Sequence, residues 1–592
     1  MKKQIWLLLI LLLSQIVLHA QTLSTENFIY TEVPQKPVQS TNYGSLSASD
    51  KQKSVTYFDG LGRPMQTIAI GHGGNGEDII TPIAYDGLGR QDKDYLPYAA
   101  LSTSAYRTDA FTKVEDFYKN LFPNEVSSVA PNPFSQKEFE ASPLNRVLQQ
   151  AAPGNDWSLS NNRTIKMDYQ ANTAIDAVKL FQVSTNLVSG LYDPTLSQST
   201  TYGAGQLYKT ITKDENWIAS DGNNKTTEEF KDKEGRVVLK RTYNSNTSHD
   251  TYYVYDNYGN LTYVLPPMAM GVLNPWVSQS TITSIAIVSS GTNLQLTASQ
   301  SITLKAPFHA QAGSTFSASI ISNQSTLDDL CYQYKYDYRN RLVEKKLPGK
   351  QWEYIVYDKL DRVVATGPAL APFNNLGQAN GWMITKYDVF NRPVLTAWMP
   401  ATVTSGDRAV LQNTQNAITV NFSEAKNATT DTTINGVSFR YSNVAWPTSG
   451  YHVLTVNYFD DYNYPNAPTI PATIETQSVL PTSTVQPKGL PTGSWTRILQ
   501  ASTDYANELA YSLYDVKGRP IRTYTKNFLG GYTYTDSKLD FTGKPEYTTT
   551  YHKRLSGDAE LKTKEVFTYS PQGRLLTQTH QIGTATPELL VN

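Results

Sequence analysis

Short segments rich in aromatic and β-branched residues alternate with polar, glycine-containing segments along most of the chain. Tyr252–Tyr255 and Leu261–Val264 are two such segments, and the polar stretch between them contains Gly259. Runs of this kind separated by turn residues are typical of β-hairpins. Residues 108–122 instead place their apolar positions at helical spacing and predict one helix that packs across a sheet. The pattern predicts a mainly β fold with few helices.

The turns between the predicted strands repeat one motif, Tyr-Asp-x-x-Gly-Arg, in ten related copies. Self-similarity of this kind indicates a repeat protein. The residues that define the turns are Asp59, Gly62, Arg63, Asp86, Gly89, Arg90, Asp232, Gly235, Arg236, Asp256, Gly259, Asp337, Asn340, Arg341, Asp358, Asp361, Arg362, Asp388, Asn391, Arg392, Asp515, Gly518, Arg519, Asp540, Gly543, Gly573 and Arg574.

The residue types at these positions predict the geometry of the turn. An Asp at the first position accepts hydrogen bonds from backbone N–H groups two residues on. The fourth position is Gly, Asn or Asp in every copy, and these residues tolerate a positive φ. Each copy is therefore expected to be one hairpin that needs its neighbours for stability. The Asp and Arg residues are expected to form turns and to link neighbouring hairpins, rather than to form a binding surface.

At these residues the chain resembles the bacterial RHS/YD-repeat family. The resemblance implies a spiralling antiparallel β-sheet of YD-repeat hairpins, part of an RHS shell, which in the family encloses a variable C-terminal effector. Residues 28–157 resemble the domain of unknown function that opens secreted RHS proteins, through Val55–Gln66, Tyr95–Tyr98, Glu140–Arg146 and Ala152–Trp157.

The expected domain order follows the repeats and the segments that interrupt them. Residues 158–267 are predicted to form a YD-repeat sheet, and 268–328 resemble a three-coathanger stack, a small stacked β-coil insert in which His309 is expected to be structural. Residues 329–592 are predicted to continue the shell. Within them, 401–450 and 465–495 are expected to be an insertion and a long loop without a packed core of their own.

The N-terminus and the composition point to export. Residues 1–20 combine Lys2 and Lys3 with an apolar run and end at Ala20, which predicts a cleaved signal peptide and a secreted or cell-surface protein without a membrane span. The net charge is -1, so no basic field would attract nucleic acid. The single cysteine, Cys331, excludes an internal disulfide framework.

Candidate chemistry is sparse. Residues 71–76 match G-x-G-x-x-G, but a strand-like run containing Pro82 follows where a dinucleotide loop needs a helix, so a hairpin loop is favoured. Asp460 and Asp461 are neighbours, and neighbouring strand residues point to opposite faces, which favours a solvated turn or a degenerate repeat. We therefore predict no catalytic residues, no cofactor and no metal.

The functional expectation is a non-enzymatic, exported β-shell scaffold. Because nothing in the sequence resembles the family's self-cleaving core segment, the chain is interpreted as the N-terminal part of a shell. Its expected partner is a C-terminal effector or a downstream RHS segment. The alternative is a surface adhesin or glycan-binding module that uses exposed Tyr and Trp, and a hydrolase with an unrecognised site is the third candidate.

Overall fold

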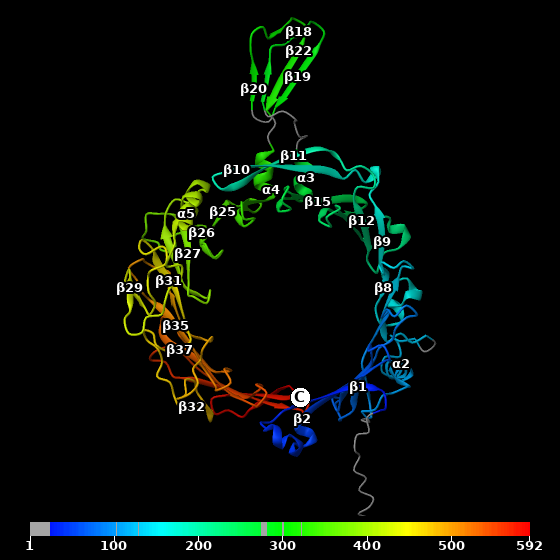
Figure 1. The fold of residues 1–592 in the computed structure, drawn as a ribbon, viewed down its shortest axis with the longest axis vertical. Helices are drawn as coiled ribbons and strands as arrows, with labels where there is room; N and C mark the ends of the chain where they lie inside the picture. The colour runs from blue at the N-terminus through cyan, green and yellow to red at the C-terminus, as the bar shows by residue number, and fades with distance from the viewer. Residues whose placement is uncertain are drawn as a thin grey trace, which may run out of the picture.

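The computed structural model describes residues 24–101, 104–127, 130–273, 281–298, 301–320 and 323–591. The predicted signal peptide lies outside these ranges. The chain is mainly β, and its strands follow one another around a ring, so that the last strands return to the neighbourhood of β2 (Figure 1). The fold therefore has the expected class, an antiparallel sheet built from hairpins.

Two sheets form the ring. The N-terminal sheet has five strands, β1 (Asn27–Pro34), β2 (Lys51–Phe58), β3 (Pro64–Ile70), β4 (Asp78–Pro82) and β6 (Tyr98–Ala100). The main sheet has 26 strands. Its first strands are β5 (Lys93–Tyr95), β7 (Phe134–Phe139), β8 (Val147–Ala151), β9 (Ile165–Ala171), β10 (Lys179–Val188), β11 (Leu191–Thr201), β12 (Tyr208–Lys213), β13 (Thr226–Lys231), β14 (Val237–Asn244), β15 (Thr247–Tyr255) and β16 (Leu261–Leu265).

The main sheet continues after residue 330 with hairpins of the same kind. These strands are β23 (Tyr332–Asp337), β24 (Leu342–Lys346), β25 (Trp352–Tyr357), β26 (Val363–Leu370), β27 (Asn380–Tyr387), β28 (Pro393–Pro400), β31 (His452–Phe459), β34 (Pro491–Arg497), β35 (Asn507–Tyr514), β36 (Pro520–Lys526), β37 (Gly530–Leu539), β38 (Pro545–Leu555), β39 (Leu561–Tyr569), β40 (Leu575–Ile582) and β41 (Glu588–Val591). Consecutive strands pair antiparallel, as in β25–β26 and β39–β40.

A β-bulge follows each repeat turn whose flanking strands pair. In β25–β26, Tyr357 pairs with Val363 and Val356 pairs with Ala365, which leaves Val364 as the extra residue. The extra residues are Met65, Leu148, Val238, Thr262, Val343, Val364, Val394, Thr492, Ile521, Glu546 and Leu576. Because a bulge bends its strand and increases the local twist, its regular recurrence explains the curvature of the sheet.

The core lies between the sheet and segments that cover its outer side. Helices α2 (Ala110–Leu121), α3 (Pro267–Val272), α4 (Gln324–Leu330) and α5 (Ser405–Ala417) and the small hairpins β29–β30 (Thr432–Ile434, Val437–Phe439) and β32–β33 (Thr473–Ile474, Gln477–Ser478) supply this cover (Figure 1). The largest core cluster joins Trp382, Ile384 and Val456 of the sheet to Phe439 and Tyr441 of the insertion.

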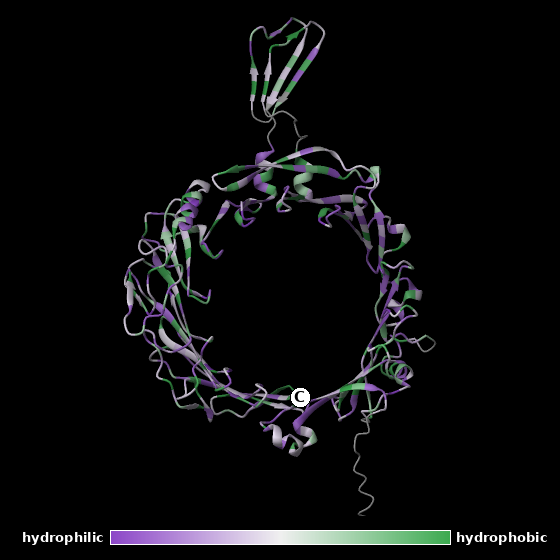
Figure 2. Cartoon of the chain, in the orientation of Figure 1, coloured by the Kyte–Doolittle hydropathy of each residue, from purple (hydrophilic) through white to green (hydrophobic). Residues whose placement is uncertain are grey.

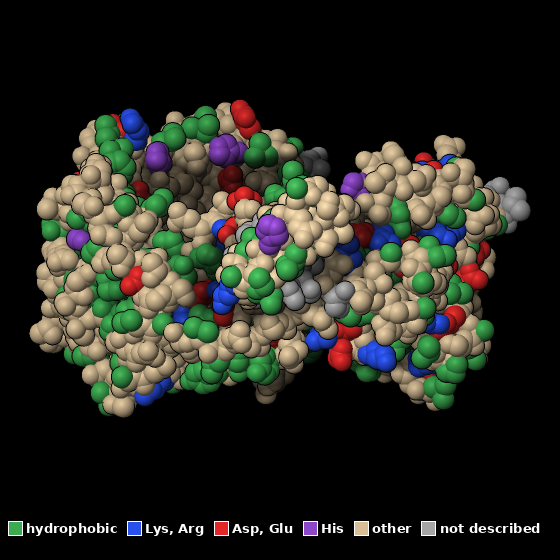
Figure 3. Space-filling model, turned by 90° about the horizontal axis from the view of Figure 1, so that it is seen from above, with side chains coloured by type: hydrophobic (Ala, Val, Ile, Leu, Met, Phe, Trp, Pro, Cys, Tyr) green, Lys and Arg blue, Asp and Glu red, His purple; other side chains and the backbone are tan. Residues whose placement is uncertain are grey.

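Across β35–β39 the inner side of the ring carries a row of hydroxyl groups. Hairpin β32–β33 lies outside the ring and packs against Leu513, so the alternate neighbour Ser512 points inward. Ser512, Thr523, Thr535, Thr550 and Thr563 pair in register as one row across β35–β39. Hydrophilic and hydrophobic residues alternate along the strands (Figure 2), and a view from above shows hydrophobic side chains scattered among polar ones (Figure 3).

One expectation needs correction. The predicted helix at 108–122 is present as α2, but it is not the one substantial helix, because α5 has 13 residues. The sequence pattern missed α5 because its buried side is polar, with Arg408, Gln412 and Gln415. The insertion at 401–450 contributes Val437, Phe439 and Tyr441 to the core that it shares with the sheet.

The segment at 268–328 contains stacked parallel strand pairs. The pairs are β17–β20 (Thr281–Ser284, Ser301–Leu304), β18–β21 (Ile287–Val288, His309–Ala310) and β19–β22 (Asn293–Ala298, Thr315–Ile320). They project from the ring as a separate lobe (Figure 1). His309 pairs with Ile287 and is exposed.

Candidate functional site: the chain of repeat turns

The repeat turns lie along one edge of the sheet, which we call the front rim. Each turn joins one strand to its antiparallel neighbour, so every second connection falls on the same edge. The connections between successive repeats, such as residues 71–77 between β3 and β4, fall on the opposite edge, the back rim. All the turn residues predicted from the sequence are thereby brought to the front rim.

The turn at 358–362 shows the geometry of one repeat. The Asp358 N–H donates to the Arg362 carbonyl at 3.0 Å, and the Asp361 N–H donates to the Asp358 carbonyl at 3.2 Å. Oδ1 of Asp358 accepts the N–H groups of Leu360 and Arg362, each at 2.9 Å. Its Oδ2 accepts Nε–H of Arg362 at 2.8 Å. The carboxylate thus satisfies both the turn backbone and the guanidinium.

The fourth residue has a positive φ in all ten turns. The angle ranges from 58° at Asn340 to 99° at Gly543. At Asn340, Asp361 and Asn391 a residue with a side chain adopts this conformation, where a short polar side chain is tolerated best. The left-handed geometry that the residue types predict is therefore present at each of these positions.

The repeat tyrosine has a role that the sequence did not reveal. Its hydroxyl donates to a carbonyl of the preceding hairpin, at the residue just before the bulge. The bonds run from Tyr85 to Pro64, Tyr169 to Val147, Tyr255 to Val237, Tyr336 to Leu261, Tyr357 to Leu342, Tyr387 to Val363, Tyr514 to Pro491 and Tyr569 to Pro545, at 2.5–3.2 Å. In these eight places a hydrogen bond thereby fastens one hairpin to the hairpin before it.

The repeat arginine contacts the next hairpin along the chain, in the direction opposite to the tyrosine bond. Its guanidinium lies over the next aromatic ring, with Arg63 over Tyr85, Arg90 over Phe139, Arg146 over Tyr169, Arg236 over Tyr255, Arg341 over Tyr357, Arg362 over Tyr387 and Arg392 over Phe459, at 4.3–5.1 Å from the ring centroid. Such cation–π contacts add to the coupling between neighbours. Together, the tyrosine bond and the arginine contact form what we call the Tyr–Arg staple.

Several arginines also reach the next turn directly. Nη1 of Arg341 lies 2.7 Å from Oδ1 of Asp361, and Nη1 of Arg362 donates to Oδ1 of Asn391 at 3.1 Å. Arg392 binds both carboxylate oxygens of Asp460, at 3.0 and 2.6 Å. The front rim is thus a polar chain that runs from turn to turn.

The electrostatics of the rim favour charged turn carboxylates. The backbone N–H of Arg63 holds the pKa of Asp59 below its usual value, and Arg90 does the same for Asp86. At Glu140 a hydrogen-bonded Arg146 lowers the pKa to about 2. Burial raises the pKa of Tyr387, so its hydroxyl keeps the proton that it donates. These shifts suit a structural ion chain, since no proton has to move for it to form.

Two degenerate copies complete the chain. Glu140 and Arg146 form a turn in which Glu140 N–H donates to the Arg146 carbonyl at 2.9 Å, although the loop is two residues longer than in the other copies. Asp460, with φ of 74°, takes the place of a turn aspartate beside Arg392. Of the readings left open for Asp460, the structure favours a degenerate repeat. The sequence feature that could have identified the copy at Glu140–Arg146 is Phe139-Glu140 followed by Asn145-Arg146, which resembles the Tyr-Asp and Asn-Arg of other copies.

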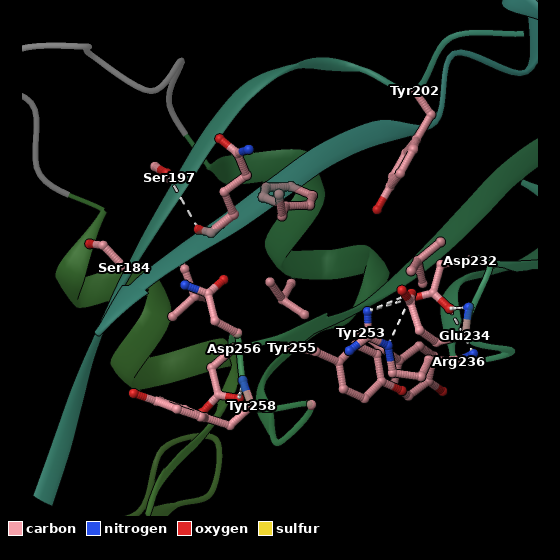
Figure 4. A pocket seen from close by; sticks show the side chains of 17 residues that line it. Ser184, Ser197, Tyr202, Asp232, Glu234, Arg236, Tyr253, Tyr255, Asp256 and Tyr258 are labelled. Atoms are coloured by element: carbon pink, nitrogen blue, oxygen red, sulfur yellow. Dashed lines mark hydrogen bonds and ion pairs between the residues drawn. The ribbon is translucent and has the colours of Figure 1, made fainter. Parts of the chain in front are cut away.

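A pocket of about 740 Å³ lies between the β10–β11 hairpin and the sheet, beside two repeat turns (Figure 4). Its carboxylates are already engaged, because Asp232 binds Arg236 at 2.7 Å and Asp256 accepts the N–H of Tyr258 at 2.9 Å. Glu234 pairs with Arg236 at 3.1 Å. The pocket is therefore lined by groups that stabilise turns, and it does not present a converging acid–base pair.

No group of three or more His, Cys, Asp or Glu residues could hold a metal ion within the described ranges. None of the helices in those ranges is long and apolar enough to cross a membrane. Residues 71–76 form the loop between β3 and β4, so a strand follows the G-x-G-x-x-G motif.

The N-terminal part of the chain matches a family model, and most of the chain aligns with solved structures at low similarity. Residues 30–171 match the family model described as "Domain of unknown function (DUF6443)", which confirms the expected N-terminal domain of unknown function. No curated protein matches. Among solved structures, "Crystal Structure of TcdB2-TccC3" matches with a TM-score of 0.40 and 11% identity over 91% of this chain.

Two further structures are similar. "Crystal Structure of TcdB2-TccC3-TEV" has a TM-score of 0.35 and 11% identity over 96% of this chain. "Structure of Photorhabdus luminescens Tc holotoxin pore, Mutation TccC3-D651A" has a TM-score of 0.31 and 12% identity over 91% of it. This chain spans 22%, 23% and 26% of the three solved chains, respectively.

Proposed function

We propose that this protein is a non-enzymatic, exported shell scaffold whose curved wall surrounds a polypeptide cargo. The observation that carries the proposal is the coupling of neighbouring hairpins by one or both contacts of the Tyr–Arg staple, repeated around a ring. A staple between neighbours builds a continuous wall without requiring any long-range core. The predicted signal peptide supports export, and the turn carboxylates are engaged in structure rather than poised for chemistry.

The inner wall fits such a role. The row of Ser512, Thr523, Thr535, Thr550 and Thr563 presents hydroxyl groups, and Thr535 bonds Thr550 at 2.8 Å. Hydroxyl groups carry no net charge and bury little apolar area, so they offer a passing chain few strong contacts. A wall of this kind can retain a polypeptide without selecting one sequence.

The stacking of the tyrosines weighs against the glycan-binding alternative. Tyr511, Tyr524, Tyr534 and Tyr551 stand side by side across β35–β38, with ring centroids 4.5–6.2 Å apart. The last ring is capped by Lys562, 5.3 Å from its centroid. A sugar stacks on the open face of an aromatic ring, and here the faces cover one another.

The test uses the full chain and a labelled, permanently unfolded polypeptide such as reduced, carboxymethylated α-lactalbumin. We expect weak association that falls when inner-face hydroxyls are replaced by large charges, as in Thr523→Glu with Thr550→Glu. The matched outer-face control, Lys526→Glu, should not change it. Association that is unaffected by inner-face changes, or glycan binding that is lost when Tyr524 is changed to Ala, would contradict the proposal.

A further inference from the structure

The glycine-rich loop at 71–77 lies where the two ends of the ring meet. It connects β3 to β4 on the back rim of the N-terminal sheet, next to Gln52 at the start of β2. The proposed function does not use this loop. The end of the described chain returns to β2 (Figure 1), so the loop faces strands that are about five hundred residues away in sequence.

The contact across this seam involves one repeat turn, residues 570–574. Nε2 of Gln52 donates to the carbonyl of Gln572 at 2.8 Å. A Cβ added at Gly573 would lie 3.3 Å from that same Nε2, and one added at Gly71 would lie 3.6 Å from Nε2 of Gln572. A Cβ at Gly74 would lie 3.8 Å from Nη2 of Arg574. Side chains of the turn therefore lie against the backbone of the loop, and the side chain of Gln52 lies against the backbone of the turn.

The turn that enters the seam differs from the others in its first residue. Ser570 stands where the other nine copies have Asp, and its hydroxyl accepts only the backbone N–H of Arg574, at 3.2 Å. No carboxylate of its own turn therefore holds the Arg574 guanidinium, which lies beside the loop that contains Glu77. Hydrogen bonds from Asn75 lower the pKa of Glu77, and the positive charge of Arg574 adds to this effect.

We propose that Gln52 and residues 71–77 form an acceptor for the repeat turn 570–574, and that the replacement of Asp by Ser570 frees Arg574 to dock there. The turn belongs to the front rim and the acceptor to the back rim. A front-to-back contact joins two different surfaces, so it offsets the two ends along the ring axis. The sheet is then one winding of a spiral, held at its seam by this joint.

The test is a cross-link in the full chain. Gln52→Cys and Gln572→Cys are combined and treated with a short bis-maleimide at low protein concentration. The native Cys331 is fully buried, so it is not expected to react with the maleimide. The control pair is Gln52→Cys with Gln149→Cys, on β8. The seam pair should react within one molecule at least about tenfold faster, because the joint holds the two thiols at a high effective concentration.

A second set of variants asks whether Arg574 makes the joint. Arg574→Glu should slow the seam cross-link, and adding Glu77→Arg should restore its rate, whereas Lys526→Glu should leave it unchanged. Circular dichroism verifies that each variant is folded. Equal rates for the seam and control pairs, cross-links only between molecules, or no effect of Arg574→Glu would each overturn the proposal. These outcomes do not depend on whether the wall surrounds a cargo.

Discussion

The strands from β25 to β31 and those from β37 to β41 share the same turns but differ in what covers them. In the first region, which we call the covered region, Trp382, Ile384 and Val456 are fully buried and pack against the insertion. In the second, the thin region, none of the described hydrophobic side chains is buried beyond Ile521. The thin region is held by its strand pairing, the tyrosine stack and the hydrogen bond from Tyr569 to Pro545.

This contrast separates the features that set the geometry of the sheet from those that supply its stability. The turn, the bulge and the tyrosine hydrogen bond set the geometry, since they are present in both regions. The insertions supply buried apolar area, which is the main source of stability. A repeat sheet of this kind can therefore keep its curvature where it has little core, but it is expected to open there first.

The largest expected effect is on a buried ion pair in the covered region. Lys386 and Glu424 are each 1% exposed and lie 3.0 Å apart. Glu424→Ala leaves the lysine buried without its partner and should reduce the free energy of unfolding by about 3–5 kcal/mol. Urea unfolding measures the change. Glu565→Ala, a half-exposed partner of His580 in the thin region, is the control and should have little effect; equal losses would contradict the contrast.

The next effect should not depend on what covers the strands, because it depends on the turn alone. Gly259 and Gly518 have φ of 82° and 76°. Changing either to Ala forces a side chain into the left-handed conformation and should cost about 1–2 kcal/mol. Gly60, which has no positive φ and no atom near its added Cβ, is the matched control. A cost at Gly60→Ala equal to that at Gly518→Ala would show that backbone handedness is not the cause.

Removing a staple hydroxyl should have a smaller effect that differs between the regions. Tyr387→Phe removes the bond to the Val363 carbonyl at 2.8 Å and should cost about 0.5–1.5 kcal/mol. Tyr569→Phe, in the thin region, should cost less because water can replace the bond to Pro545. Hydrogen exchange of the flanking amides locates the loss. An effect of Tyr569→Phe larger than that of Tyr387→Phe would contradict this ordering.

The smallest expected effect is a pH dependence confined to the covered region. His452 lies against Phe373 and Trp398, and burial lowers its pKa. A histidine that is harder to protonate when folded destabilises the fold as the pH falls below its unfolded pKa of about 6.5. His452→Gln should abolish this early decrease. The turn carboxylates, with lowered pKa values, should add a loss only below about pH 4.

The sequence predicted the turns well because their geometry is local. Asp358 and Asp361 are three residues apart, and the handedness of one residue decides the turn. The tyrosine staple was not predictable in the same way, because the acceptor of Tyr387 is Val363 on the previous hairpin, exposed by a bulge. Helix α5 was missed because its buried side is polar, although Thr404 and Asp407 form a capping box.

The most direct test of the central claim is an image of the molecule. Electron microscopy of the purified chain should show rings of one winding with a thin sector opposite the lobe formed by residues 281–320 (Figure 1). The staples should also keep those rings intact when Glu424→Ala has destabilised the covered region. Compact globules, or rods without curvature, would contradict the account that stapled repeat turns shape the sheet.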